Sequence, residues 1–551
     1  MRFIAAILAL LALALAGCGG SSGGSTSNSS SAPAASPFHP AGVTVTPTTP
    51  SASSSVSQVT WDEPYGEPAS LDPLKSYALP ENTVLSNTCD ALLRTGPELR
   101  LQPGLATSYT HPTSTTWVFK IRQGVHFWDG HPLTVSDVVY SLNRHLNPKL
   151  GTFYTAWVAD IKSIAQSGPE EVTLTTKVPD VMVAQMMASG LGTVIEKAYA
   201  EAKGEAYGTA SGGIMCTGPF QLKSWQTGQQ ITLTRNPSYW DAALEPKVQT
   251  LVFKFITDAT TLTNALSSGA IDGAYEVPIQ GIPQLGSAGK MYYGLSTNQG
   301  ILQPIQKTGL STNLKVREAL SMVIDRSGIA KTVFQGLAVP ELAAVPPDSF
   351  SYATQQYQQW YLGVGTPTTP DVSAARKLVE EAGNPKTAMT IGIQQGDSQS
   401  AAVATAIQSA AKSIGLNMQV KALPTAQYVE LIFSEKARAG IDWTTGNNNY
   451  IDQAEPLQVL YYWGRSNSPY NLDGFANHEV DSLFAQARAQ NNPSQRATLA
   501  IRALQLWVKP VNNIPLYIYP ERLFMNKRIT GAPSSFSTFL YYPWAAALGG
   551  T

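Results

Sequence analysis

Alternating apolar and polar positions predict several β-strands. In the segment TTWVFKIRQGVHFWDG, one face carries Trp117, Phe119 and Ile121, and the other carries mostly polar side chains. This period of two is typical of a half-buried strand. We expect the strand to turn at Gly124 into a second strand. Residues 218–241 alternate in the same way around a turn at 227–228 and predict a hairpin, and a further strand is predicted over 58–61.

Other segments repeat their apolar positions at helical spacing. The clearest stripe consists of Val135, Val138, Val139, Leu142 and Leu146. Thr134 lies three residues before Asp137, which is a capping pattern, and Pro148 follows the end. Helices are also predicted before Gly269, over 314–335, over 371–383 and before Gly415, the last followed by a strand. The repeated order of helix and strand predicts an α/β lobe over 312–510, whereas the strands and helix of 116–148 predict an α+β unit.

The first residues follow a different pattern. Residues 3–16 contain no polar side chain after Arg2, as in an export signal, and the run is shorter than the roughly 20 residues that span a membrane. Leu15-Ala16-Gly17-Cys18 is similar to a bacterial lipobox and predicts a lipoprotein signal over 1–17 with a lipid on Cys18. An ordinary secretory signal with a chance cysteine is the alternative. Residues 19–56 lack Asp, Glu, Lys and Arg, so we expect a disordered tether over 18–56.

Composition narrows the classes of function. The 37 Lys and Arg residues balance 38 Asp and Glu, which argues against nucleic acid as a partner. Charged residues make up 14%, compared with about 25% in typical soluble domains. The roughly 490 residues after the tether are too many for one core and predict two or three lobes. In an exported chain, Cys89 and Cys216 are expected to form a disulfide, with two buried free thiols as the alternative.

Catalytic and metal motifs do not emerge from the sequence. From residue 57 onward it contains no G-x-S-x-G, no G-x-x-x-x-G-K-[ST], no H-E-x-x-H and no C-x-x-C. His126 and His131 lie near Asp129, which would permit a metal site. A solvated turn is the favoured interpretation, because loop spacing alone does not fix three ligands. We therefore predict a protein that is not an enzyme and has no cofactor or metal.

Several segments in order resemble the extracellular solute-binding proteins of the peptide and nickel class, the receptors of ABC importers. These include TTWVFKIRQGVHFWDGHPLTVSDVVYSLNRHLNP, CTGPFQLKSWQTGQQITLTRNPSYWD, LKVREALSMVIDRSGIAKTVFQG and NIPLYIYPERLFM. The resemblance covers almost the whole chain after the tether. It implies an α/β, two-lobed periplasmic-binding-protein type II fold with a hinged cleft and an inserted α+β domain. Lobe I is expected over 57–100, 206–311 and 511–551, the inserted domain over 101–205, and lobe II over 312–510.

The resemblance also points to one loop as a ligand contact. In peptide-binding relatives, an aspartate in a pattern like ADYxDP pairs with the α-ammonium of the peptide. The corresponding segment here is TTGNNNYIDQAEP, in which Asn449 takes the place of that aspartate, while Tyr450 and Asp452 match the pattern. Either a shifted register lets Asp452 bind the amine, or the ligand has no free amine there. Asn447 of the same loop is also assigned to the site.

Residues around this loop complete the expected site. Arg438 and Arg465 flank it and would suit a ligand carboxylate, with solvated surface charges as the alternative. The aromatic residues that bracket the loop are divided between core and ligand contacts; they are Trp443, Tyr461, Tyr462 and Trp463. Lobe I is expected to contribute Tyr65, Thr88 and Asp90.

The implied partners are a peptide or other small solute, the ABC permease, and the membrane through the lipid on Cys18. The class implies an exported, extracytoplasmic protein that acts as a monomer and captures ligand by lobe closure. Within the class, a receptor for haem, a nickel chelate or an oligosaccharide is the alternative. Outside it, a surface sensory protein would use the same hinge.

Overall fold

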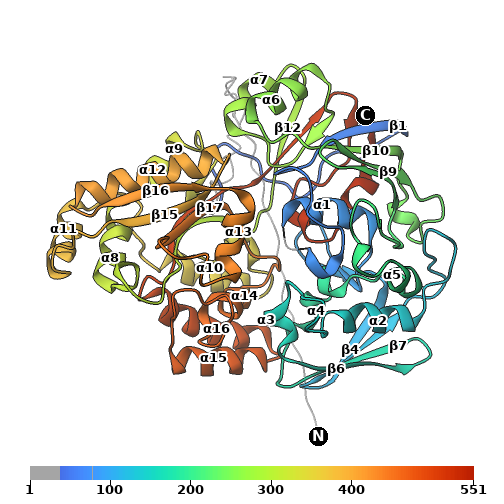
Figure 1. The fold of residues 1–551 in the computed structure, drawn as a ribbon, viewed down its shortest axis with the longest axis horizontal. Coiled ribbons are helices and arrows are strands. Elements are labelled where there is room, and N and C mark those ends of the chain that lie inside the picture. Colours follow the sequence, from blue (N-terminus) through green and yellow to red (C-terminus); the bar gives the residue numbers. More distant parts are fainter. Residues whose placement is uncertain (1–36, 77) are drawn as a thin grey trace, which may run out of the picture. The chain divides into compact units, whose positions relative to one another are not determined.

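This computed structural model describes residues 37–76 and 78–551, with only the backbone of residues 447–450. The predicted signal and Cys18 lie outside the described residues. Three main β-sheets organise this part of the chain (Figure 1). None of the helices in the described ranges is both long enough and apolar enough to cross a membrane.

The first sheet has seven strands, in the order β12-β19-β11-β1-β10-β9-β8, and defines lobe I. Its members are β1 (Val56–Asp62), β8 (Phe220–Gln226), β9 (Gln230–Arg235), β10 (Val248–Lys254), β11 (Gly273–Ala274), β12 (Gly289–Gly294) and β19 (Glu521–Asn526). The predicted hairpin is present as β8 and β9, which pair Leu222 with Leu233. Helices α1 (Leu79–Thr88), α6 (Ala259–Ser268) and α7 (Ile282–Leu285) belong to this lobe. As predicted, α6 ends at Gly269, which takes a left-handed conformation.

The second sheet has six strands, in the order β14-β18-β13-β17-β15-β16, and defines lobe II. They are β13 (Asn298–Pro304), β14 (Val339–Pro340), β15 (Met389–Gln394), β16 (Met418–Leu423), β17 (Trp443–Tyr450) and β18 (Ile514–Ile518). Its helices are α8 (Leu314–Val323), α9 (Arg326–Thr332), α10 (Thr354–Leu362), α11 (Val372–Glu381), α12 (Ser398–Ser413), α13 (Thr425–Phe433), α14 (Leu457–Val459), α15 (His478–Arg488) and α16 (Pro493–Val508). The single helix predicted over 314–335 is two helices, because Ile324 is extended and Asp325 caps α9 through the N–H of Gly328.

The third sheet, β4-β5-β7-β6, is antiparallel and forms the core of the inserted domain. Its strands are β4 (Ala106–Thr113), β5 (Thr116–Ile121), β6 (Ile161–Gly168) and β7 (Glu171–Thr176). Helix α2 (Val135–Arg144) packs on β6 and β7 and has the predicted capping box of Thr134 and Asp137. The second strand expected after Gly124 is wrong. That segment forms only a bridge between His126 and Pro132, because β4 and β7 occupy both edges of β5.

Shorter elements connect these sheets. They are β2 (Leu93–Thr95), β3 (Leu101–Pro103), β20 (Ile529–Thr530), β21 (Gly549–Gly550), α3 (Thr155–Val158), α4 (Val183–Met186) and α5 (Lys197–Lys203).

The chain passes between the first two sheets at two neighbouring places. Residues 295–297 join β12 to β13, and residues 519–520 join β18 to β19. Strands β13 and β18 pair with each other in the second sheet, and β12 and β19 pair in the first. By sheet membership, β13 and β18 therefore belong to lobe II, although the sequence analysis placed residues up to 311 and from 511 in lobe I. Two adjacent crossing segments are the structural basis of a hinge.

The tether predicted over 18–56 is wrong for its second half. Thr46 donates its backbone N–H to the carbonyl of Tyr293 at 2.9 Å, and Ser53 does the same to Gly550 at 3.0 Å. On the lobe II side, His39 pairs with Asp348 at 3.1 Å. A segment without charges still carries backbone hydrogen-bonding groups, and these find partners along lobe I.

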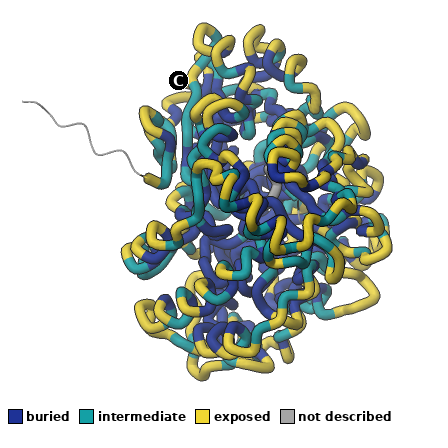
Figure 2. Tube along the Cα trace, turned by 90° about the vertical axis from the view of Figure 1, so that its left-hand side faces the viewer, coloured by how far each residue is buried: buried dark blue, intermediate teal, exposed yellow. Residues whose placement is uncertain are grey.

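One hydrophobic cluster runs from the inserted domain into lobe II. It joins Trp157 and Leu174 with Tyr461, Phe484 and Leu504. Buried residues fill the interior, whereas exposed residues lie on the outer turns and helices (Figure 2). The inserted domain and lobe II are therefore packed together.

Candidate ligand-binding site

A cavity of about 290 Å³ lies between the two lobes. Lobe I supplies Tyr65, Glu67 and the start of α1, and the inserted domain supplies Phe153. Lobe II supplies side chains from β13, α13, β17 and the segment 452–472. Ligand cavities usually measure about 300–1,000 Å³. This one is near the lower limit and suits a small solute.

The cavity wall combines aromatic rings with neutral hydrogen-bonding groups. Its aromatic members are Tyr65, Phe153, Tyr428, Tyr462, Trp463 and Tyr470, and its neutral polar members are Gln303, Gln394, Thr425 and Thr444. Tyr65 has a positive φ of 64° and is followed by Gly66, also with positive φ, so a tight turn presents its ring to the cavity. The aromatic rings of this wall can contact apolar groups of a ligand, and its neutral polar side chains can form hydrogen bonds with a peptide backbone.

Asp452 is the acid that lobe II presents to the cavity. It follows β17 by two residues, after the fully buried Ile451. The hydroxyl of Tyr462 donates to Oδ2 of Asp452 at 3.0 Å. Burial raises the pKa of Asp452 to about 7, and the hydrogen bond from Tyr462 opposes this rise. Near neutral pH this carboxyl is therefore divided between its protonated and charged forms, and a cationic group beside it would favour the charged form.

Two more carboxylates line the cavity from lobe I. Glu67 has both oxygens engaged, one by the indole N–H of Trp225 at 2.6 Å and the other by the N–H of Gly228 at 2.8 Å. Glu81 accepts the N–H of Ala69 through Oε1 at 2.8 Å. Its Oε2 has almost no accessible surface, and the backbone N–H groups of Ala78 and Glu81 itself also bond to the carboxylate. Burial raises the pKa of Glu81, so the protein environment does not by itself favour the charged form.

No cation balances these acids at the wall. Among the lining residues that the structure describes, none is Lys, Arg or His. Residues 77 and 447–450 are tyrosines and asparagines, so they add no cation either. The cavity is therefore acidic on an otherwise neutral and aromatic wall.

Two of the predicted site residues line the cavity, namely Tyr65 and Asp452. Tyr462 and Trp463, from the aromatic run beside the loop, also line it, whereas Tyr461 stacks on Trp157 with ring centroids 4.4 Å apart. The side chains of Asn447, Asn449 and Tyr450 lie outside the described residues.

The predicted lobe I residues Thr88 and Asp90 are engaged inside the protein. The hydroxyl of Thr88 donates to the carbonyl of Val84 at 3.1 Å. Asp90 accepts hydrogen bonds from Arg94, Thr217, Tyr239 and Trp240 at 2.8–3.0 Å. Four donors saturate this carboxylate, so its role is structural. Both residues are next to Cys89, which forms a disulfide with Cys216 at a Cα–Cα distance of 5.0 Å.

The arginines predicted to hold a ligand carboxylate are also engaged elsewhere. Arg438 donates to the carbonyl of Leu431 at 3.0 Å, near the end of α13. Arg465 donates to the carbonyl of Ala156 at 3.0 Å and pairs with Asp160 of the inserted domain at 3.3 Å. Trp443 is fully buried in the core of lobe II. Neither arginine is among the described lining residues, and both satisfy protein carbonyls.

Sequence reasoning missed Glu81, Gln303, Gln394 and Tyr428. No motif marks them, because they come from four separate elements that meet only in the folded protein. Tyr470 was also missed, although an aromatic residue soon after the run 461–463 was a signal that could have suggested it.

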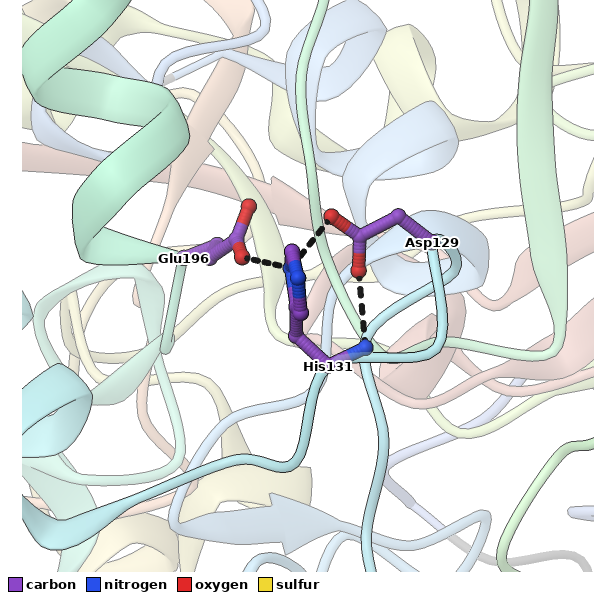
Figure 3. A group of neighbouring side chains, drawn as sticks. All are labelled: Asp129, His131 and Glu196. Carbon is purple, nitrogen blue, oxygen red and sulfur yellow. Dashed lines mark hydrogen bonds and ion pairs between the residues drawn. The ribbon is translucent and has the colours of Figure 1, made fainter.

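A second polar cluster lies in the inserted domain (Figure 3). Nδ1 of His131 is 2.9 Å from Oδ2 of Asp129 and 2.9 Å from Oε1 of Glu196. The backbone N–H of His131 also donates to Asp129. The two carboxylates raise the pKa of His131. A protonated, exposed His131 side chain paired with both acids accounts for this cluster. None of the three residues lines the cavity.

Two lobes joined by a double crossover and enclosing a cavity define a binding protein of the two-lobed periplasmic type. Two solved structures share this fold. DppA from Helicobacter pylori, in complex with the peptide STSA, has a TM-score of 0.78 at 18% identity, covering 89% of this chain and 98% of the other. AgaA from A. tumefaciens R10, in complex with agropinic acid, has a TM-score of 0.78 at 21% identity, covering 90% and 98%.

The sequence relationship is more specific. Residues 100–468 match the bacterial extracellular solute-binding proteins, family 5 middle region, and the chain belongs to this family. The glutathione-binding protein GsiB of Salmonella typhi is 26% identical over 474 residues, which cover 84% of this chain and 89% of the relative. The class predicted from the sequence is thereby confirmed.

Proposed function

We propose that this protein is the substrate-binding component of an ABC importer and that it captures short peptides, or similar small solutes with a free amine, outside the membrane. The observation that carries this proposal is Asp452, an acid at the cavity wall with no cation beside it. A ligand ammonium would supply the missing charge, and charge-assisted hydrogen bonds are roughly twice as strong as neutral ones.

The rest of the wall suits the body of such a ligand. Gln303, Gln394 and Thr425 offer neutral donors and acceptors to peptide N–H and C=O groups. The aromatic rings offer apolar contact to side chains of different shapes. Main-chain hydrogen bonds supply affinity in this mode of recognition, while pockets for side chains set specificity.

Capture would proceed by lobe closure. The cavity wall is divided between lobe I, the inserted domain and lobe II, so a bound ligand contacts all three. A ligand shifts the equilibrium toward the closed form only by its greater affinity for that form. Contacts on both sides of the hinge provide that difference.

The proposed membrane anchor and the remaining partners are those that the sequence predicts. A lipid on Cys18 would hold the protein at the outer surface of the membrane. The permease would receive ligand from the closed protein, which acts as a monomer and catalyses no reaction.

The test is to purify the native protein from its own cells and identify the small molecules released on denaturation by mass spectrometry. Short peptides with free amines would support the proposal. Haem, a nickel chelate or an oligosaccharide would show that the ligand is not a peptide, while the assignment to a binding-protein fold would stand. Failure to recover any molecule, together with no calorimetric response to a mixed peptide library, would favour a sensory protein.

A further inference from the structure

Helix α13 turns one face toward the ligand cavity. Thr425, Tyr428, Val429 and Ile432 of this helix all line the cavity. They are spaced three or four positions apart around the helix, so they form one continuous stripe along it. Gln427, on the opposite side of the helix, is exposed to solvent. One side of α13 is therefore a wall of the cavity, and the other is an outer surface of the protein.

The stripe is polar at its first residue and apolar at its end. The hydroxyl of Thr425 accepts a hydrogen bond from the side-chain amide of Gln394 at 3.2 Å. Val429 and Ile432 carry only hydrocarbon, and both are half-buried, so each keeps accessible surface. Because an α-helix rises about 1.5 Å per residue, Thr425 and Ile432 lie roughly 10 Å apart along the axis, the length of about three extended peptide residues. A short peptide can therefore contact both ends of the stripe.

The apolar part of the stripe is continued by its neighbours in the cavity wall. Ile305, Leu431 and Leu472 line the cavity and belong to one buried hydrophobic cluster. Trp463 lines the cavity as well and is half-buried. A ligand side chain that enters this part of the cavity exchanges water for hydrocarbon and ring surface. Such an exchange stabilises an apolar side chain and penalises a polar one.

A row of aromatic rings connects the end of α13 to Asp452. The ring centroid of Phe433, the last residue of the helix, lies 6.0 Å from that of Phe153 and 6.5 Å from that of Tyr470. The centroid of Tyr470 lies 5.1 Å from that of Tyr462, whose hydroxyl donates to Asp452. The apolar end of the stripe is therefore linked through side-chain contacts to the acid at the cavity wall.

We infer that α13 sets the specificity of this cavity: Val429 and Ile432 select a ligand whose first or second residue has a large apolar side chain. This inference rests on the proposed function and names its substrate class, which is peptides of about two to three residues with a leucine-like or phenylalanine-like side chain near a free N-terminus. A ligand held at Asp452 by its ammonium directs its first residues along α13. The polar groups of Thr425 and Gln394 then remain for the N–H and C=O groups of the later residues.

The test extends one ligand side chain in small steps. The probes are the tripeptide amides X-Ala-Ala-NH2 and Ala-X-Ala-NH2, in which X is alanine, aminobutyric acid, norvaline, norleucine or glutamine. Isothermal titration calorimetry on the full chain without its signal should show, in one of the two series, that each added methylene tightens binding by up to about 4-fold. The norleucine peptide should bind at least about 10-fold more tightly than the alanine peptide. The glutamine peptide, whose side chain has a similar length, should bind about as weakly as the alanine peptide.

Two variants test whether α13 is the wall that selects the side chain. Val429→Thr keeps the shape of the residue and places a hydroxyl at the cavity, and Ile432→Asn makes the other apolar position polar. Each should lower the ratio of norleucine to alanine affinity by about 3-fold or more, with little effect on the alanine peptide. Gln427→Thr is the matched control, because it introduces the same β-branched residue on the exposed side of the same helix. It should leave the ratio unchanged.

The outcomes separate this inference from the proposed function. If the norleucine, glutamine and alanine peptides bind the wild-type protein equally, the apolar subsite is overturned while peptide binding stands. A wild-type ratio that survives both variants would overturn the role of α13. If the native protein binds none of the peptides, the proposed function fails as well. The wild-type series needs no variant, so equal binding overturns the inference even if a variant does not fold.

Discussion

The indole N–H of Trp157 in the inserted domain donates to the hydroxyl of Tyr462 in lobe II at 2.6 Å. The same hydroxyl donates its proton to Asp452 at 3.0 Å. One short chain of hydrogen bonds therefore connects the inserted domain to the acid at the cavity wall. Because Trp157 holds the oxygen of the hydroxyl that donates to Asp452, the contact between the inserted domain and lobe II helps to position this acid.

Replacing Asp452 by Asn removes the charge and keeps the shape. We expect Asp452→Asn to weaken binding of a peptide with a free amine by about 10- to 100-fold, because a charge-assisted hydrogen bond is lost. Calorimetry with a free peptide and its N-acetylated form measures the effect. The acetylated peptide should bind both proteins with the same weak affinity. An equal loss for both peptides would mean that Asp452 acts on folding and not on the amine.

Ligand affinity should depend on pH through Asp452. Its pKa of about 7 in the folded protein lies above the ordinary value of 3.8, so the unliganded fold binds the proton more tightly than the unfolded chain does. Asp452 therefore lowers stability as the pH rises from about 4 to 7, by about 4 kcal/mol at most. A bound ammonium favours the charged carboxylate of Asp452 over its protonated form. Binding at pH 6 should therefore release a proton, and affinity should increase up to about pH 7.

Calorimetry at pH 6 in two buffers with different ionisation enthalpies measures the released proton. The neighbours that influence Asp452 electrostatically are Tyr154, Tyr462, Tyr470 and Tyr541, and burial raises their pKa values further, so they stay protonated between pH 5 and 8. Glu81 shares the cavity and also has a raised pKa, so Asp452→Asn is the necessary comparison. Proton release that persists unchanged in Asp452→Asn would assign it to another group.

Trp157→Phe should weaken ligand binding by about 3- to 10-fold, because it removes one hydrogen bond that spans the inserted domain and lobe II. Phenylalanine retains a ring to stack on Tyr461. Small-angle scattering with saturating ligand should show a less compact average form. Trp128→Phe is the matched control, since its indole N–H donates to Gly218 at 3.2 Å and not to lobe II. Equal behaviour of the two variants would exclude the proposed link.

The disulfide should stabilise the protein without shaping the ligand site. Cys89 and Cys216 are 127 residues apart in the sequence, and closing a loop of that length restricts the unfolded chain. The variant with both cysteines replaced by alanine should lose about 2–5 kcal/mol of unfolding free energy in urea titration. Neither cysteine is among the described lining residues, so affinity at low temperature should be unchanged. An unaltered urea midpoint would contradict this expectation.

Removal of residues 37–56 should destabilise the protein. The hydrogen bonds from Thr46 to Tyr293 and from Ser53 to Gly550 would be lost, together with that from the hydroxyl of Thr49 to Ala532 at 2.8 Å. At about 0.5–1.5 kcal/mol each, we expect a loss of about 2–4 kcal/mol. Thermal unfolding of chains that start at residue 37 and at residue 57 provides the comparison. Equal melting temperatures would show that the segment binds too weakly to contribute.

The sequence by itself determined the local elements and the class of protein. Helix α2 and its capping box, the β8–β9 hairpin and the end of α6 at Gly269 follow from side-chain periodicity and from capping and turn residues, which act over a few positions. The family resemblance gave the two-lobed fold and identified the loop that contains Asp452. These properties depend on residues close together in the chain or on an ordered series of motifs.

Only the tertiary structure decided which polar residues line the cavity. Asp90, Arg438 and Arg465 were predicted to face it, yet each is satisfied by partners inside the protein, such as Asp160 for Arg465, which is 305 residues away. Glu81 was not predicted to line the cavity, because α1 meets the residues of lobe II there only in the folded protein. Composition likewise failed for residues 37–56, since their hydrogen-bond partners, such as Tyr293, Ala532 and Gly550, are supplied by segments far away in the chain. Long-range hydrogen bonding and burial, which leave no local pattern, determine the roles of these residues.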